Sequence, residues 1–132
     1  MLTIYTAPSC TSCRKAKEWL DAYEIPYIEK NLAKEGLSLN ELRRILMMTD
    51  DGTAEILSQR SNAFHDLTVN LEELSLTELF ELIKKDIGLL RRPIILDSKR
   101  IQIGYNEDDI RRFIPRKLRK IEMTQARMKA GF

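Results

Sequence analysis

The chain has 132 residues, of which 43% are hydrophobic and 32% are charged, enough for one domain with a modest core and too little for two. Its 22 basic and 20 acidic residues leave a net charge of +2, which excludes a disordered polyelectrolyte and a globally basic nucleic-acid binder. No stretch approaches the roughly 18 apolar residues that cross a bilayer, so we expect a single cytoplasmic domain over residues 1–132 that does not contact a membrane.

The first thirty residues predict a β-α-β opening. Residues 2–6 are β-branched and aromatic, as in a strand, and residues 7–9 then break the pattern. A helix should begin near Cys10, because apolar residues recur after it at spacings of three and four. Residues 26–28 resemble a second strand, and a right-handed crossover would place the two strands parallel.

Two capping boxes predict helices in the middle of the chain. Ser38 to Glu41 and Ser75 to Glu78 both have the required spacing, and each precedes an apolar helical pattern. Between them, residues 50–53 have the composition of a tight turn, and we expect Thr53 to cap a short helix. Residues 59–71 fit no single pattern.

Residues 94–114 predict a hairpin and a helix. Residues 94–97 and 101–103 have the composition of strands and are joined by a polar turn. Asn106 is placed to cap a helix with an apolar side, and another helix is expected after Pro115. The order β-α-β-helices-β-β-α predicts an α/β protein of the thioredoxin-like fold, with a mixed four-stranded sheet and a helical insertion between its two strand pairs.

The C-terminal end is strongly basic. Residues 111–132 contain eight basic residues and one acidic residue, a net charge of +7 that leaves −5 for the first 110. We predict that residues 116–132 form a basic, helical extension of the domain. Its basic face would touch nucleic acid or an acidic partner, or would simply be solvated. Because few aromatic residues accompany these charges, sequence-specific DNA reading has little support.

Cys10 and Cys13 form a Cys-x-x-Cys motif at the predicted junction of strand and helix. Unpaired N–H groups and the positive end of a helix stabilise an anion such as a thiolate. We therefore expect Cys10 to be the nucleophile with a lowered pKa, and Cys13, on the same helical face, to resolve it. Arg14 and Lys15 add positive charge, and the motif beside a β-α-β pattern favours redox chemistry.

The alternatives for the two cysteines are half of a zinc site or a chance pair. A structural zinc site needs roughly four ligands, whereas the chain adds only His65 to its two cysteines. We therefore expect no metal and no cofactor, and we assign His65 no role.

Arg92 precedes Pro93 at the predicted start of a strand. A proline is tolerated there, and a cis peptide facing the cysteines is one option. Arg92 would then reach Cys10 and stabilise a thiolate or an oxyanion. The alternative is an exposed arginine that forms surface ion pairs of little value.

Three segments together resemble the arsenate-reductase-like (ArsC-like) family, which has a thioredoxin-like core. They are Tyr5–Ala16, Leu89–Ile95 and Gly104–Asp108, and the resemblance extends over essentially the whole chain. It is similar in particular to the non-enzymatic transcriptional regulators of this family. These bind the C-terminal domain of the RNA polymerase α subunit. They meet promoter DNA only as part of the polymerase complex, and they are degraded by the ClpXP protease with an adaptor.

The resemblance also implies roles for individual residues. Cys10 and Cys13 would be a disulfide switch that activates thiol-stress genes, while the same contact with the polymerase interferes with activator-dependent transcription. Gly52 matches the glycine needed for binding to the α subunit, and Arg92 matches the arginine near the first cysteine. Arg60 and Arg92 resemble two oxyanion-binding arginines of the reductases, so Arg60 would be a relic of that site.

Two enzymatic alternatives stay open beside the regulator. A glutaredoxin-coupled arsenate reductase would need a further arginine near residues 101–104, where none occurs. A disulfide with Cys13 would also divert Cys10 from the mixed-thiol intermediate of such an enzyme. A general dithiol oxidoreductase would reduce disulfides without binding polymerase.

Overall fold

Four short strands form a mixed sheet in the order β2-β1-β3-β4 in this computed structural model, which describes residues 1–68 and 70–115. The strands are β1 (Leu2–Thr6), β2 (Tyr27–Asn31), β3 (Ile94–Leu96) and β4 (Ile101–Ile103). β1 pairs with β2 in parallel and with β3 antiparallel, and β3 pairs antiparallel with β4. The predicted thioredoxin-like α/β topology is therefore confirmed.

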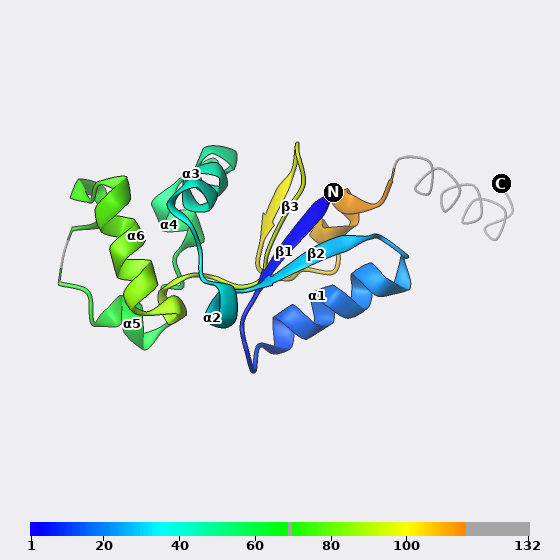
Figure 1. Ribbon diagram of the computed structural model, residues 1–132, viewed down its shortest axis with the longest axis horizontal. Coiled ribbons are helices and arrows are strands. Elements are labelled where there is room, and N and C mark those ends of the chain that lie inside the picture. The colour runs from blue at the N-terminus through cyan, green and yellow to red at the C-terminus, as the bar shows by residue number, and fades with distance from the viewer. Residues whose placement is uncertain (69, 116–132) are drawn as a thin grey trace, which may run out of the picture.

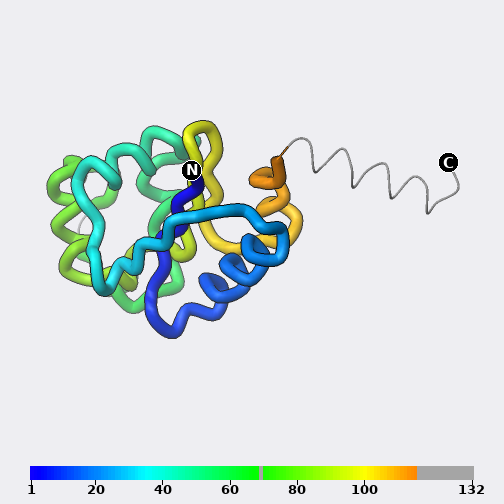
Figure 2. The backbone as a smooth tube through the Cα atoms, turned by 45° about the vertical axis from the view of Figure 1, so that its right-hand side comes forward, coloured from blue at the N-terminus to red at the C-terminus, as the bar shows by residue number. Residues whose placement is uncertain are grey.

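The helices separate into two groups around the sheet (Figures 1 and 2). α1 (Thr11–Ala22) connects the parallel strands, and the short helix η3 (Asp109–Phe113) lies beside it. The insertion between β2 and β3 contains α2 (Leu32–Glu35), α3 (Leu39–Met48), α4 (Thr53–Ile56), α5 (Asn62–His65), η1 (Leu71–Glu73), α6 (Leu76–Lys85) and η2 (Ile87–Leu89). The helical insertion that the sequence predicts is present.

Alternating residues of the sheet enter two apolar cores. Ile4 and its partner Ile95 pack with α1 and η3, whereas Tyr5 and Ile94 pack with the helices of the insertion. This follows from the period of two along a strand, which sends successive side chains to opposite faces. β1 and β3 are consequently buried on both faces of the sheet.

The cap of α4 differs from the prediction. Gly52, not Thr53, occupies the N-cap position, with φ of 67°, and Thr53 is the first helical residue. The side chain of Glu55 accepts hydrogen bonds from the backbone N–H groups of Asp50 and Asp51, each at 3.1 Å. These bonds fix the turn from within the helix, so it needs no side-chain cap from a threonine.

The segment after β4 also differs from the prediction. Asn106 does accept hydrogen bonds from the N–H groups of Asp108 and Asp109, but the helix that follows is a short 3-10 helix, η3. Pro115 restricts the residue before it to an extended conformation, so a longer α-helix has no room to form. The apolar side is confirmed, because Ile110, Phe113 and Ile114 are buried.

Three further expectations concern residues 59–71, the C-terminal extension and the absence of a membrane span. The unassigned stretch 59–71 contains α5 and the start of η1. The predicted basic helix over 116–132 lies outside the described residues. Within the described residues, no helix is long and apolar enough to span a membrane.

Glu41 connects the capping box of α3 to the sheet. Its side chain accepts hydrogen bonds from the Ser38 N–H at 3.2 Å, the Tyr5 hydroxyl at 2.6 Å and the Lys30 ammonium at 2.9 Å. Burial alone raises the pKa of Glu41, but these hydrogen bonds outweigh it and hold the pKa below its usual value. The capping box of α6 also forms, yet among the described residues Glu78 there bonds only to Ser75, and it is exposed.

The paired capping boxes give a matched test of this connection. We expect Glu41→Gln to lower the free energy of unfolding at pH 7 by about 1–2 kcal/mol, since a charged acceptor is lost. Glu78→Gln should lower the free energy of unfolding by less, because Glu78 is exposed. Because the pKa of Glu41 is lowered on folding, its contribution is complete above the ordinary value of about 4.5 and disappears as the pH falls through the folded-state pKa. Urea unfolding at neutral and acidic pH measures both effects, and equal losses for the two variants at pH 7 would contradict the role of Glu41.

Candidate redox site

The start of α1 holds Cys10 in a capping position. β1 ends at Thr6, and the loop that follows turns at Ser9, whose φ is 57°. Cys10 is the N-cap residue, with extended backbone angles, and its sulfur accepts the N–H of Cys13 at 3.3 Å. The cysteine that the sequence places at the helix start is therefore at the positive end of the helix.

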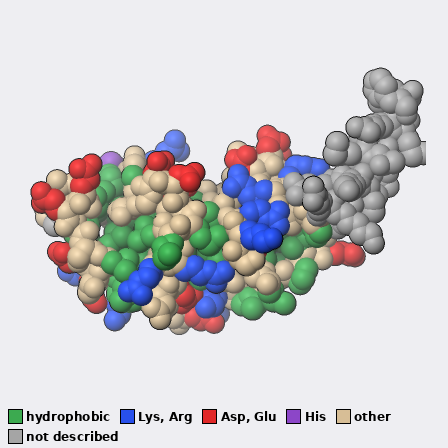
Figure 3. All heavy atoms as spheres, turned by 90° about the horizontal axis from the view of Figure 1, so that it is seen from above, with side chains coloured by type: hydrophobic (Ala, Val, Ile, Leu, Met, Phe, Trp, Pro, Cys, Tyr) green, Lys and Arg blue, Asp and Glu red, His purple; other side chains and the backbone are tan. Residues whose placement is uncertain are grey.

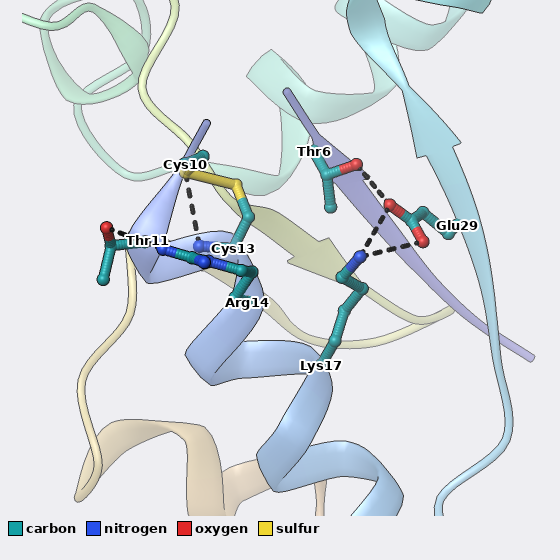
Figure 4. Close-up of a disulfide and its surroundings, with 7 residues drawn as sticks. All are labelled: Thr6, Cys10, Thr11, Cys13, Arg14, Lys17 and Glu29. Carbon is teal, nitrogen blue, oxygen red and sulfur yellow. Dashed lines mark hydrogen bonds and ion pairs between the residues drawn. A yellow bond between two sulfur atoms is a disulfide. The ribbon is translucent and has the colours of Figure 1, made fainter. Parts of the chain in front are cut away.

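Cys10 and Cys13 are joined by a disulfide (Figure 4), with their Cα atoms 5.2 Å apart. The two cysteines differ in exposure, because Cys13 is only 2% exposed whereas Cys10 is partly exposed. A reagent from solution therefore reaches Cys10 first once the bond is reduced. The first turn of α1 contains no acidic residue that would oppose a thiolate there.

A second group of polar side chains lies beside the disulfide, and sequence reasoning missed it. Thr6, Lys17 and Glu29 come from β1, α1 and β2 and are joined by hydrogen bonds and an ion pair (Figure 4). The one signal in the sequence was the spacing of four between Cys13 and Lys17, which places them on one helical face. The partner Glu29 is set by the pairing of β1 and β2, which the sequence does not display.

Arg92 lies two residues before the start of β3 and is partly buried, and the peptide bond between Arg92 and Pro93 is cis. Within residues 1–68 and 70–115, Arg92 forms no hydrogen bond or ion pair, and none joins it to either cysteine. The reach of Arg92 to Cys10 therefore stays a prediction.

Arg60 is exposed and lines a cavity of about 530 Å³ together with Arg91, which the sequence analysis did not single out. Arg91 is held in place by its own backbone N–H, which donates to the Ile56 carbonyl at 2.8 Å, and by its guanidinium, which donates to the Glu55 carbonyl at 3.2 Å. Arg92 is not among the residues that line this cavity. The structure therefore brings Arg60 together with Arg91 and not with Arg92.

Gly52 lies in an open turn. Its φ of 67° lies in the left-handed region that favours glycine, and a Cβ added there would meet no atom within 4 Å. Met47, near the end of the preceding helix α3, is 79% exposed. A side chain at position 52 would therefore project into solvent or against a partner rather than into the fold.

The described residues contain no group of three or more His, Cys, Asp or Glu side chains suited to hold a metal ion. His65 lies at the end of α5, with its ring edge-on to Phe64 at 6.2 Å between centroids.

On the face seen in Figure 3, acidic and basic side chains are interspersed with apolar atoms.

The family model described as "ArsC family" matches residues 5–113 of this chain. The chain belongs to the ArsC family. Within the family, it is 56% identical over 131 residues, covering 99% of both chains, to the "Global transcriptional regulator Spx" of Enterococcus faecalis. It is 59% identical over 126 residues, covering 96% of both chains, to the protein of the same name from Listeria innocua. The family resemblance inferred from the three sequence segments is confirmed.

A solved structure has a similar fold. It is titled as a possible arsenate reductase from Streptococcus mutans, and the match has a TM-score of 0.70 and 29% identity. The match covers 83% of this chain and 97% of the other. The chain is therefore similar in sequence to proteins named as regulators and similar in fold to a protein titled as a possible reductase.

The difference in exposure between the two cysteines predicts a difference in reactivity. We expect Cys10 in reduced Cys13→Ala protein to react with iodoacetamide about tenfold faster than Cys13 in Cys10→Ala protein, because Cys10 is accessible and lies at the helix start. Mass spectrometry of timed samples measures both rates. Equal rates would contradict the assignment of Cys10 as the nucleophile.

Proposed function

We propose that this ArsC family member is a redox-sensing global transcriptional regulator that binds the C-terminal domain of the RNA polymerase α subunit. Bound there, it activates genes of thiol and disulfide stress and interferes with activator-dependent transcription. The observation that carries the proposal is the Cys10–Cys13 disulfide at the start of α1. The similarity of nearly the whole chain to proteins named as global transcriptional regulators supports it.

The switch operates by thiol oxidation. The Cys10 thiolate attacks hydrogen peroxide and breaks its O–O bond, forming a sulfenic acid at Cys10 and releasing hydroxide. The Cys13 thiolate then displaces hydroxide from that sulfur, and the disulfide forms. Because Cys10 is also the N-cap of α1, the new bond fixes the first turn of the helix that it caps. We propose that Arg92 stabilises the Cys10 thiolate of the reduced state.

The surface that binds the α subunit lies around α1 and the turn at Gly52. The open surroundings of Gly52 and the exposure of Met47 support a contact at this turn. Promoter DNA is approached only within the polymerase complex, and ClpXP with an adaptor removes the protein. No catalytic turnover, metal or cofactor is part of this function.

The enzymatic alternative is an arsenate reductase, and the fold shared with the Streptococcus mutans protein is the observation that favours it. Two features oppose it. Cys13 is buried and bonded to Cys10, which competes with a mixed-thiol intermediate, and β4 with Gly104 contains no arginine. Arg60 is then a remnant of an oxyanion site. A general dithiol oxidoreductase is the third candidate, and it requires no polymerase contact.

The experiment that tests the proposal measures binding of the reduced and the oxidised protein to the isolated C-terminal domain of the α subunit, with arsenate reduction and disulfide reduction assayed on the same samples. Binding without turnover is the expected result. Turnover without binding would overturn the regulator and establish one of the two enzymes.

The cysteines should control promoter output rather than binding. We expect the Cys10→Ala, Cys13→Ala and double Cys10→Ala/Cys13→Ala proteins to retain affinity for this polymerase domain, because alanine preserves the helical backbone of α1 and leaves the Gly52 turn unchanged. All three should activate transcription equally with and without oxidant. In vitro transcription with purified polymerase measures this. Retained dependence on oxidant in the double variant would show that the pair is not the switch.

Gly52→Arg should weaken binding to the same polymerase domain at least about tenfold, because the added side chain projects from an open turn toward the partner. Gly36→Arg is the matched control. Gly36 also has a positive φ, of 71°, and open surroundings, but lies after α2, so it should suffer the same backbone strain without losing affinity. Calorimetric titration of both folded variants decides the matter, and equal affinities would remove this turn from the interface.

A further inference from the structure

Glu29 bridges the last residue of β1 and the second turn of α1, beside the disulfide (Figure 4). One of its oxygens accepts the Thr6 hydroxyl at 2.7 Å, and both of its oxygens lie 3.2–3.3 Å from the Lys17 ammonium. Thr6 is only 2% exposed, while the side chains of Lys17 and Glu29 are 30% and 35% exposed. The buried hydroxyl therefore holds a partly exposed ion pair at a fixed place.

Lys17 is directed toward the cysteine turn. It follows Cys13 by four residues, which are neighbours on a helix surface, roughly 5–6 Å apart at their Cβ atoms. Side chains of a helix also lean toward its N-terminus, over the preceding turn. Figure 4 shows the Lys17 side chain extending toward the N-terminal end of α1 and ending at Glu29, which also accepts the Thr6 hydroxyl. The positive charge of Lys17 and the negative charge of Glu29 thus lie beside the redox pair.

We propose that Lys17 and Glu29 are positioning residues that set the thiol–disulfide equilibrium of Cys10 and Cys13 by opposing charge. Lys17 stabilises the thiolate of the reduced state, and Glu29 offsets part of that effect by pairing with Lys17. The hydrogen bond from Thr6 holds Glu29 in the position where it pairs with Lys17. The inference rests on the proposed redox switch and assigns its set point to residues outside the Cys-x-x-Cys motif.

The ionisation of Glu29 supports this arrangement. The hydrogen bond from Thr6 has the largest effect and lowers the pKa of Glu29, while burial opposes it. The hydrogen bond and the charge of Lys17 lower the pKa further, so the net shift is downward. Glu29 is consequently a carboxylate at neutral pH. Its charge is present over the whole pH range in which a thiol titrates.

The sign of the effect follows from the balanced reaction. Dithiothreitol supplies two electrons and loses its two thiol protons as it becomes a cyclic disulfide, while the Cys10–Cys13 bond breaks. Cys13 takes up one of these protons and becomes a thiol, and the other enters solution because Cys10 is left as a thiolate. Because the product carries a new negative charge, a nearby cation favours reduction and a nearby anion opposes it.

The test is the equilibrium constant for reduction by dithiothreitol, measured on the full chain at neutral pH. We expect Glu29→Gln to increase it about threefold to tenfold and Lys17→Met to decrease it by a similar factor. A tenfold change corresponds to about 30 mV for a two-electron couple. Absorbance of the thiolate should show the pKa of Cys10 falling in Glu29→Gln and rising in Lys17→Met.

Two further variants separate charge from structural support. Lys15→Met removes the same charge two residues from Cys13, where side chains do not share a face, and should shift the equilibrium less. Lys17→Arg keeps the charge and should restore the wild-type value. Since the Debye length falls to about 3 Å at 1 M salt, the opposite shifts of Glu29→Gln and Lys17→Met should also shrink there.

Shifts of the same sign in Glu29→Gln and Lys17→Met, or shifts no larger than that of Lys15→Met, would overturn this inference while leaving the redox switch intact. A wild-type pair that does not equilibrate with dithiothreitol would overturn the switch itself, and this inference with it. The two failures are therefore distinguishable in one series of measurements.

Discussion

The rest of the structure depends on the pairing of β1 along both of its edges. β2 pairs with it in parallel and β3 antiparallel, and its two faces supply side chains to two separate cores. This pairing fixes the position of Thr6. The loop of residues 7–9 then leads to Cys10, the N-cap of α1. A parallel pair needs a crossover connection, and here that connection is the helix whose first turn contains the cysteines. The redox site is therefore a direct consequence of the sheet topology.

The arrangement places chemistry at the end of a helix rather than inside the core. Cys10 caps α1 with its own sulfur, so the residue that would become a thiolate is the one that satisfies an unpaired N–H group. Cys13 is buried below it and therefore suits a resolving cysteine better than a second nucleophile. The ion pair of Lys17 and Glu29 lies on the same side of the helix (Figure 4), and it connects the helix to both parallel strands.

The helical insertion is connected to the same strand from the other face. The hydroxyl of Tyr5 donates to Glu41 in the first turn of α3, so one side chain of β1 reaches the insertion while its neighbour Thr6 reaches Glu29. Burial, followed by this hydrogen bond, raises the pKa of Tyr5 well above its usual range, and the hydroxyl stays a donor.

The sequence by itself determined the features that depend on local chemistry. Periodicity, capping boxes and turn residues located the strands, α1, α3 and α6, and the Cys-x-x-Cys spacing located the redox pair, because each signal lies within a few neighbouring residues. Only the tertiary structure decided which distant residues meet. Glu55 replaced Thr53 in fixing the α4 turn, and Arg91 rather than Arg92 came to share a cavity with Arg60. Glu29 was brought to Lys17 by strand pairing, which depends on the packing of the whole sheet and leaves no local pattern in the chain.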